Sequence, residues 1–273
     1  METKKVALIT GASSGIGMET AYKLHENGYI VYGAARRTER MKDLEKKGIH
    51  VVALDVTDDK SMISCVNQII EKEGRIDVLV NNAGYGSYGA IEDVPLDEAR
   101  RQFEVNIFGL ARLTQLVLPQ MRKNHYGKIV NISSMGGKVY TKFGGWYHAT
   151  KHALEGFSDS LRLETKGFGI DVVVVEPGGI KTEWGQIAVD NLKKTSGSGP
   201  YASSANKSAD NMEKLYANNQ LSDAKVIAEV IYKSVTARRP RIRYAKGYMA
   251  KPAIFMRKWF GDRFFDMVIS RMS

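Results

Sequence analysis

The stretch VALITGASSGIG, residues 6–17, decides the fold. It begins with five apolar or β-branched residues, which predict a buried strand, and a turn with three glycines leads from this strand into a helical pattern. Glycine permits a tight turn and close approach of the backbone to a pyrophosphate, while a helix N-terminus offers free N–H donors. The stretch therefore predicts a dinucleotide site whose contacts are Gly11, Ser13, Ser14, Gly15, Ile16 and Gly17.

The alternation of short apolar runs and longer amphipathic segments continues to about residue 177. Because the runs are almost continuously apolar, they are typical of parallel strands that are covered by helices on both faces. The pattern predicts an α/β fold of the Rossmann type, with a doubly wound sheet. The predicted strands are 6–10, 29–35, 50–56, 77–81, 128–132 and 171–176, and the predicted helices are 15–27, 59–73, 97–122 and 147–166.

The pattern changes after residue 177. Residues 193–211 are rich in Ser, Gly, Asn and Lys and show little apolar periodicity, which predicts a mobile loop or lid, and helical periodicity returns over 221–236. No repeat or linker sets the tail apart. We therefore expect a single domain, in which 1–185 form the dinucleotide-binding core with the catalytic residues. Residues 186–273 would supply a substrate loop or lid and the closing elements.

Composition excludes several classes of protein. The chain has 273 residues, of which 43% are hydrophobic and 26% charged, so neither disorder nor a collagen-like repeat is expected. The one cysteine, Cys65, allows no intramolecular disulfide and no cysteine-based metal site. The N-terminus lacks a secretory pattern, and no window approaches the roughly 20 apolar residues of a membrane span. We expect a cytoplasmic protein without a metal.

The formal net charge of +10 is concentrated at one end of the chain. Residues 233–273 hold 11 of the 40 basic side chains and only 2 of the 30 acidic ones, and aromatic residues are mixed among them. The nearly neutral remainder carries no nucleic-acid motif, so no nucleic-acid partner is expected. A basic aromatic tail is typical of peripheral membrane contact, but its rings would equally suit closure of a substrate pocket or a subunit contact.

Tyr147 and Lys151 lie four residues apart in a predicted helix, so both side chains emerge on one face. An unperturbed tyrosine, with a pKa of about 10, is a poor base near neutrality. A nearby ammonium group favours the phenolate, lowers this pKa and makes the phenol usable for proton transfer. The alternative is an ordinary amphipathic pair on a surface helix.

Several motifs at matching intervals over residues 4–185 resemble the classical short-chain dehydrogenase/reductase family. They are the Gly-x-x-x-Gly-x-Gly turn, Asn81-Asn82-Ala83-Gly84, Ser134, Tyr147-x-x-x-Lys151 and Pro177-Gly178. The resemblance implies a predominantly parallel seven-stranded sheet, to which the tail adds the last strand, and assembly into homodimers or homotetramers. It also implies a proton relay of Asn106, Ser134, Tyr147 and Lys151, in which Asn106 bonds backbone near the lysine.

Cofactor preference follows from charge at the end of the second predicted strand. NAD-selective relatives carry an acidic residue where this sequence has Ala35, and Arg36 and Arg37 follow it. Because guanidinium forks suit a 2′-phosphate, we expect NADP(H) in preference to NAD(H), unless Glu39 and Asp43 occupy the arginines. The resemblance implies further contacts from Asp55, Val56, Asn82, Ala83, Gly84, Tyr147, Lys151, Pro177, Gly178, Ile180 and Thr182.

Apolar and aromatic residues near these motifs predict a pocket for a lipophilic small molecule. They are Met135, Gly136, Gly137, Tyr140, Phe143, Trp146 and Trp184, which could instead pack a core or a subunit interface. The resulting hypothesis is an oxidoreductase that interconverts a lipophilic ketone or aldehyde and an alcohol, similar to hydroxysteroid and retinol dehydrogenases. The alternative is a regulatory protein that binds the nicotinamide cofactor without turnover. A lyase or epimerase of the extended group would carry a different glycine spacing.

Overall fold

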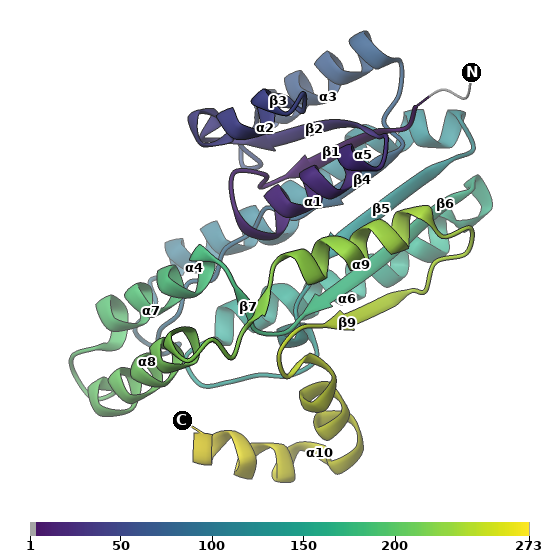
Figure 1. Ribbon diagram of the computed structural model, residues 1–273. Coiled ribbons are helices and arrows are strands. Elements are labelled where there is room, and N and C mark those ends of the chain that lie inside the picture. Colours follow the sequence, from purple (N-terminus) through teal and green to yellow (C-terminus); the bar gives the residue numbers. More distant parts are fainter. Residues whose placement is uncertain (1–3, 273) are drawn as a thin grey trace.

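The computed structural model describes residues 4–272 and is built around a seven-stranded sheet (Figure 1). Every neighbouring pair of strands in it is parallel, in the order β3-β2-β1-β4-β5-β6-β9. The predicted doubly wound sheet is confirmed, and its seventh strand comes from the basic tail. The strands are β1 Val6–Thr10, β2 Ile30–Ala35, β3 His50–Ala53, β4 Val78–Asn81, β5 Gly127–Ile132, β6 Ile170–Pro177 and β9 Arg243–Lys246.

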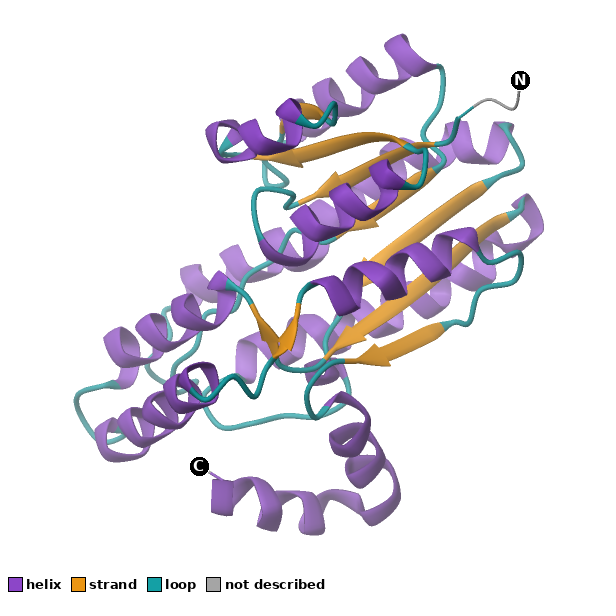
Figure 2. Cartoon of the chain, viewed as in Figure 1, coloured by secondary structure: helices purple, strands orange, loops and turns teal. Residues whose placement is uncertain are grey.

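Helices cover both faces of the sheet (Figure 2). On one face α1 (Gly15–Glu26) and α9 (Lys225–Thr236) bury their apolar sides, and on the other α3 (Asp59–Glu73), α5 (Leu110–Lys123) and α6 (Gly145–Thr165) do so. The strand residues between the two layers are therefore almost all buried, which explains their continuously apolar runs. The shorter segments are η1 Thr38–Met41, α2 Lys42–Lys46, α4 Leu96–Phe103, the π-helical η2 Glu104–Gly109, η3 Met135–Gly137 and η4 Lys166–Phe168.

The sheet changes its direction of winding between β1 and β4. The chain runs from β1 outward to β2 and β3, then returns to place β4 on the other side of β1. The hydroxyl of Thr10 accepts hydrogen bonds from the N–H groups of Asn82 (3.0 Å) and Ala83 (2.9 Å), which ties the carboxyl ends of both strands together. Ligands bind at such a switch point in open α/β sheets, because the loops on either side diverge there.

The prediction of a mobile loop over residues 193–211 is wrong. The structure has two helices, α7 (Glu183–Ser196) and α8 (Ala202–Ala217), joined by a short turn and packed on each other. Ser196, Ala205 and Ala209 are fully buried. Because such small residues let helices approach closely without a stripe of large apolar residues, the helical period was hidden. The two-residue strands β7 (Ile180–Lys181) and β8 (Ser222–Asp223) flank this pair.

The chain ends in α10 (Ala250–Met272), which projects from the edge of the sheet beyond β9 (Figure 1). Its backbone bends at Gly261, where φ is 73°, and Phe265 is buried against Val139 and Ala253. None of the helices within residues 4–272 is long and apolar enough to cross a membrane.

Gly109 offers a test of the packing between η2 and the loop after β3. A Cβ added there would overlap the backbone oxygen of Val56, whereas one added at the exposed Gly156 of α6 would meet open space. We expect Gly109→Ala to lower the free energy of unfolding by about 1–3 kcal/mol, and Gly156→Ala to raise it by about 0.5–1 kcal/mol. Urea titration of both variants measures the two effects. Equal stabilities would contradict the packing described.

Candidate active site

A cavity of about 650 Å³ opens at the carboxyl ends of the central strands. Its walls come from the loops after β1, β2, β3, β4, β5 and β6, together with residues of α6, α7 and α8. This is the size of a ligand site, and it lies at the switch point of the sheet. Of the predicted site residues, Gly11, Ser13, Ser14, Gly15, Ile16, Arg36, Arg37, Asp55, Val56, Asn82, Ala83, Gly84, Ser134, Tyr147, Lys151, Pro177, Gly178, Ile180 and Thr182 line it.

The glycine turn presents the N-terminus of α1 to this cavity. Ser14 has extended backbone and, within residues 4–272, its side chain makes no capping hydrogen bond, so the N–H groups of the first turn face the cavity without a cap. Gly17 does not line the cavity. A Cβ there would overlap the carbonyl oxygen of Gly11, so this glycine lets the helix pack on the turn. The cradle fits the pyrophosphate of a dinucleotide.

Two arginines stand at the end of β2. Arg36 and Arg37 are exposed and line the cavity, and neither has an ion-pair partner in the described part of the chain. Asp43, one of the acids that the sequence offered them, pairs with Lys46 at 2.8 Å. Arg40 pairs instead with Glu183 at the start of α7. The end of β2 therefore carries two positive charges that an anionic group could approach.

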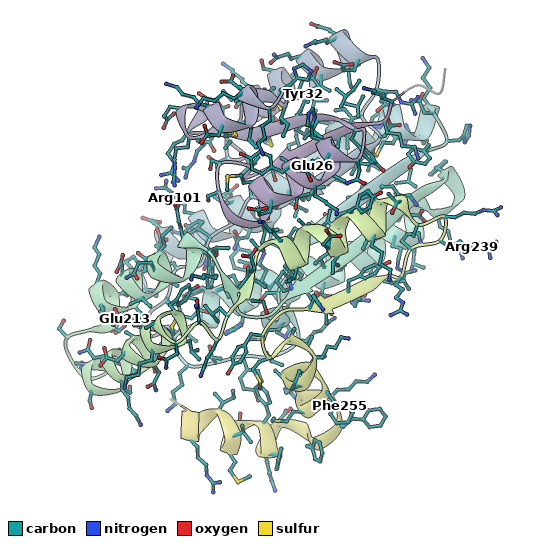
Figure 3. The ribbon with its side chains drawn as sticks, in the orientation of Figure 1. Glu26, Tyr32, Arg101, Glu213, Arg239 and Phe255 are labelled. Carbon is teal, nitrogen blue, oxygen red and sulfur yellow. The ribbon has the colours of Figure 1, made fainter. Side chains whose placement is uncertain are left out.

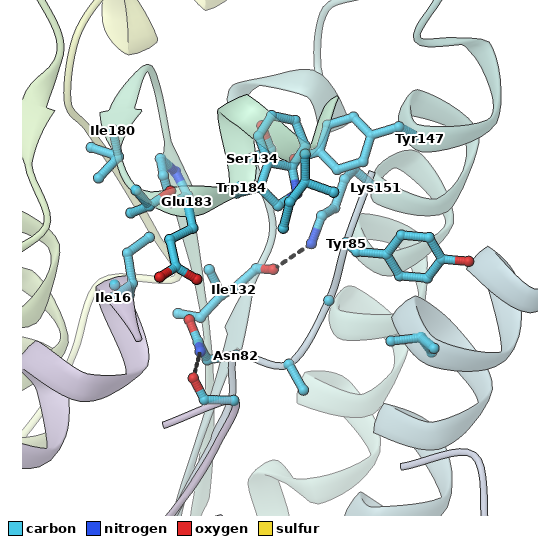
Figure 4. Close-up of a pocket in the computed structure, with 18 of the residues that line it drawn as sticks. Ile16, Asn82, Tyr85, Ile132, Ser134, Tyr147, Lys151, Ile180, Glu183 and Trp184 are labelled. Carbon is cyan, nitrogen blue, oxygen red and sulfur yellow. Dashed lines mark hydrogen bonds between the residues drawn. The ribbon is translucent and has the colours of Figure 1, made fainter. Parts of the chain in front are cut away.

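Asp55 is a turn residue as well as a cavity residue. Its Oδ1 accepts hydrogen bonds from the N–H (2.9 Å) and the hydroxyl (2.8 Å) of Thr57. Burial alone would raise the pKa of Asp55, but these bonds outweigh it and lower the pKa. On the other side of the cavity, the Asn82 amide donates to the carbonyl oxygen of Thr10 at 2.9 Å (Figure 4).

Ser134, Tyr147 and Lys151 come together at the inner end of the cavity (Figure 4). Nζ of Lys151 donates to the carbonyl oxygen of Ile132 at 2.8 Å and lies 5.8 Å from the centre of the Tyr147 ring. The Ser134 hydroxyl accepts a hydrogen bond from the N–H of Gly136 at 3.0 Å and lies near enough to Tyr147 to influence its pKa. The hydroxyl of the neighbouring Ser133, by contrast, is buried against Gly137.

Asn106 lies behind the cavity wall in the π-helical segment η2. Its Oδ1 accepts from the N–H of Tyr85 (3.1 Å), and its Nδ2 donates to the Tyr85 carbonyl (2.9 Å) and the Thr150 hydroxyl (3.1 Å). The expected bond to backbone beside the lysine is thus made at Tyr85. Gly84 separates the two side chains, because a Cβ there would lie 3.1 Å from Asn106 Oδ1 and 3.9 Å from Lys151 Nζ. Asn106 fixes the backbone that faces Lys151.

Burial dominates the electrostatics of the tyrosine and the lysine. It raises the pKa of Tyr147 to about 12, although the nearby Ser134 hydroxyl acts in the opposite direction. It lowers the pKa of Lys151 to about 8, although the negative charge of Glu155 opposes this. The net shift of the Tyr147 pKa is upward, because burial of the phenol is its largest cause. At neutral pH Tyr147 holds its proton, which is the form that donates to a carbonyl oxygen.

An aromatic wall stands beside the tyrosine. The ring of Tyr147 lies 5.1 Å from that of Trp184 and 6.0 Å from that of Tyr88, centre to centre. Sequence reasoning missed Tyr88, and it missed Tyr216 of α8 because that segment was interpreted as a loop. Of the predicted apolar pocket residues, Met135, Gly136 and Trp184 line the cavity, whereas Gly137, Tyr140, Phe143 and Trp146 do not.

No group of three or more His, Cys, Asp or Glu side chains within residues 4–272 could hold a metal ion. The arrangement therefore offers a dinucleotide cradle, a phenol that holds its proton and a buried lysine, beside an apolar wall. This combination is typical of oxidoreductases that act on a carbonyl or an alcohol group with a nicotinamide cofactor.

Comparison with known proteins identifies the family. Residues 5–193 match the profile of the short chain dehydrogenase family, so this chain belongs to it. It is 36% identical over 271 residues to the probable short-chain type dehydrogenase/reductase VdlC of Helicobacter pylori, covering 97% of this chain and 98% of the relative. A crystal structure of a short-chain dehydrogenase from Streptomyces avermitilis matches with a TM-score of 0.78 and 32% identity, covering 100% and 96% of the two chains.

Two relatives carry more specific names. One is an NADPH-dependent 3-dehydrocapnine reductase of Ornithobacterium rhinotracheale, 34% identical over 278 residues, with 97% of this chain and 95% of the relative covered. The other is a 3-ketodihydrosphingosine reductase of Bacteroides thetaiotaomicron, 44% identical over 178 residues, or 65% of each chain. The chain is an oxidoreductase of this family and binds a nicotinamide cofactor.

Glu155, one turn after Lys151 on α6, is a residue that sequence reasoning missed. It is buried, and its Oε2 accepts from Nζ of Lys138 and Nε of Arg243, each at 2.9 Å. Arg243 comes from β9, so no local sequence signal could have shown this contact. Because the Glu155 charge offsets part of the effect of burial on Lys151, it holds the pKa of the ammonium up.

We expect Glu155→Gln to lower the pKa of Lys151 further, because the amide carries no charge and leaves Lys138 and Arg243 uncompensated nearby. We expect loss of the lysine proton near pH 8 to set the alkaline limb of the rate, and this limb should move down by roughly one pH unit in the variant. Profiles of kcat/KM against pH measure this. Asp159→Asn is the matched control, since Asp159 also binds Arg243 but is half exposed. Identical alkaline limbs in the wild type, Glu155→Gln and Asp159→Asn would contradict the role of Glu155.

Proposed function

We propose that this protein is an NADP(H)-dependent reductase of a lipophilic ketone, which uses Ser134, Tyr147, Lys151 and Asn106 as its proton relay. The observation that carries the proposal is the meeting of Ser134, Tyr147 and Lys151 at the inner end of a cavity whose outer end is a dinucleotide cradle. A protein that only senses the nicotinamide pool would need the cradle but not the relay.

The cofactor would lie along the carboxyl edge of the sheet. The first turn of α1 and residues 11–16 would hold its pyrophosphate, and Arg36 and Arg37 its 2′-phosphate. Asp55 and Val56 would border the adenine, while Asn82, Ala83 and Gly84 would let backbone pass close to the ribose. The segment Pro177, Gly178, Ile180 and Thr182 would border the nicotinamide. A solved structure titled ElxO with NADP bound, 30% identical with a TM-score of 0.72, supports this choice; it covers 88% of this chain and 94% of its own.

When bound, the reduced nicotinamide supplies a hydride for the carbonyl carbon. The Ser134 hydroxyl would hold the carbonyl oxygen, and the O–H of Tyr147 would transfer its proton to that oxygen as negative charge develops there. The charged Lys151, held by the carbonyl of Ile132, would stabilise the phenolate left behind until a proton returns from solvent. Asn106 would keep the backbone at Gly84 and Tyr85 in place against Lys151.

The substrate we propose is a long-chain amino ketone. One of the two specific relatives is named a 3-ketodihydrosphingosine reductase and the other a 3-dehydrocapnine reductase. In this protein the wall formed by Tyr88, Trp184, Ile187 and Val139 is apolar and lies beside Tyr147, so it would accept an alkyl chain. NADPH absorbance followed with 3-ketodihydrosphingosine, a ketosteroid and retinal would compare this substrate with the other lipophilic classes.

We further expect a cytoplasmic protein that forms homodimers or homotetramers, as the family resemblance implies. Because a lipophilic ketone partitions into lipid, we include peripheral contact of the tail with a membrane in the proposal.

Tyr147→Phe tests the relay. The phenylalanine ring fills the same space but has no proton to transfer, so kcat should fall by about 10²–10⁴-fold while cofactor binding is retained. NADPH consumption measures kcat, and quenching of protein fluorescence by NADPH measures binding. Equal turnover by the wild type and the variant would refute the relay, and turnover by neither protein on any carbonyl would favour the sensor.

Arg36→Ala tests the cofactor preference. Loss of a charge-assisted bond to the 2′-phosphate should lower kcat/KM for NADPH by about 10- to 100-fold and leave that for NADH nearly unchanged. Arg40→Ala is the matched control, because Arg40 is held by Glu183. It should leave the NADPH to NADH ratio unaltered. A wild-type preference for NADH would contradict our interpretation of Arg36.

A further inference from the structure

The two halves of α10 present a cluster of aromatic rings to solvent. The cluster consists of Phe255, Trp259, Phe260 and Phe264, and we call it the aromatic corner. Trp259 is 68% exposed and Phe255 58% exposed, and Figure 3 shows Phe255 directed away from the body of the protein. The rings contact one another, with centres 5.0 Å apart for Phe260 and Phe264 and 6.1 Å apart for Phe255 and Trp259.

These rings do not hold α10 to the protein, because other side chains of the helix do so. Phe265 is 1% exposed and lies 5.3 Å from Tyr140, ring centre to ring centre, while Met256 and Ala253 pack into the same cluster. The Tyr140 hydroxyl also donates to Asp266 at 2.8 Å. The inner apolar face of the helix is thus already packed against the rest of the protein. The aromatic corner is a second apolar surface, which is exposed.

Positive charge surrounds the aromatic corner. Lys251, Lys258 and Arg263 are exposed, and none of them has an ion-pair partner within residues 4–272. Both acidic residues of α10 are engaged, because Asp262 pairs with Arg257 and Asp266 accepts from Tyr140. An exposed aromatic cluster bordered by uncompensated cations complements the interface of an anionic bilayer, where rings sit at headgroup level and cations meet phosphate.

The helix that carries the aromatic corner packs close to the candidate active site. The inner face of α10 packs on Met135, Val139 and Tyr140, in the segment that directly follows Ser134. Met135 and Val139 also line the cavity. One layer of side chains therefore separates the helix that carries the aromatic corner from the substrate end of the pocket.

We infer that the aromatic corner and its cations bind the surface of an anionic lipid bilayer and hold the protein at that surface. A second copy of the chain fits less well, because a two-fold contact through this surface would bring two positively charged borders together. The inference goes beyond the proposed reductase activity, since binding to lipid requires neither cofactor nor turnover.

Co-flotation of the full chain with vesicles tests this surface. Wild type should float with phosphatidylcholine vesicles that contain phosphatidylglycerol, not with phosphatidylcholine alone, and high salt should release it. Phe255→Ser combined with Trp259→Ser, and Lys258→Glu combined with Arg263→Glu, should each weaken binding at least about tenfold. Point variants are preferable to truncation, because removal of the buried Phe265 would disturb the fold.

The matched controls are Leu163→Ser, an equally exposed apolar residue on α6, and Lys123→Glu at the end of α5. Both should bind vesicles like wild type, and thermal unfolding should show all variants folded. Absent binding, salt-independent binding or equal loss in the controls would overturn the inference. The inference would also be overturned if sedimentation showed that the aromatic substitutions dissociate an oligomer while vesicle binding is unchanged. Catalytic failure alone would leave vesicle binding intact and would count only against the reductase.

Discussion

The structure depends on the junction of β1 and β4, where the sheet changes its direction of winding. The Thr10 hydroxyl accepts the backbone N–H groups of Asn82 and Ala83, and the Asn82 amide returns a bond to the Thr10 carbonyl. These contacts hold two strands together that are separated by six helices and strands in the sequence, and the loops beyond them diverge. The opening that results receives the N-terminus of α1 on one side and the relay residues on the other.

Burial then sets the chemistry of this opening. The phenol of Tyr147 and the ammonium of Lys151 are both buried, so each is driven toward its neutral form. A tyrosine that keeps its proton suits the reduction of a carbonyl. The lysine keeps its charge near neutrality in part because Glu155 lies one turn away, and Glu155 is in turn held by Arg243 from the last strand. Arg243 of the basic tail is thereby linked to Lys151 through the carboxylate of Glu155.

The sequence predicted those parts of the fold and site that local patterns encode. The six predicted strands from 6–10 to 171–176 all appear, because buried parallel strands must be continuously apolar. The glycine turn and the spacing of Tyr147 and Lys151 likewise follow from local geometry. The helices α7 and α8 were missed, since they pack through Ser196, Ala205 and Ala209, and small residues leave no strong period.

By itself, the sequence determined a doubly wound dinucleotide-binding sheet, the helical spacing of Tyr147 and Lys151, and the arginines at the end of β2. These features depend on residue type and short-range spacing. Only the tertiary structure decided the direction of the pKa shifts, the contact of Arg243 with Glu155 and the exposure of the aromatic corner. Each of these depends on which distant segments exclude water from a side chain, and no local pattern carries that information.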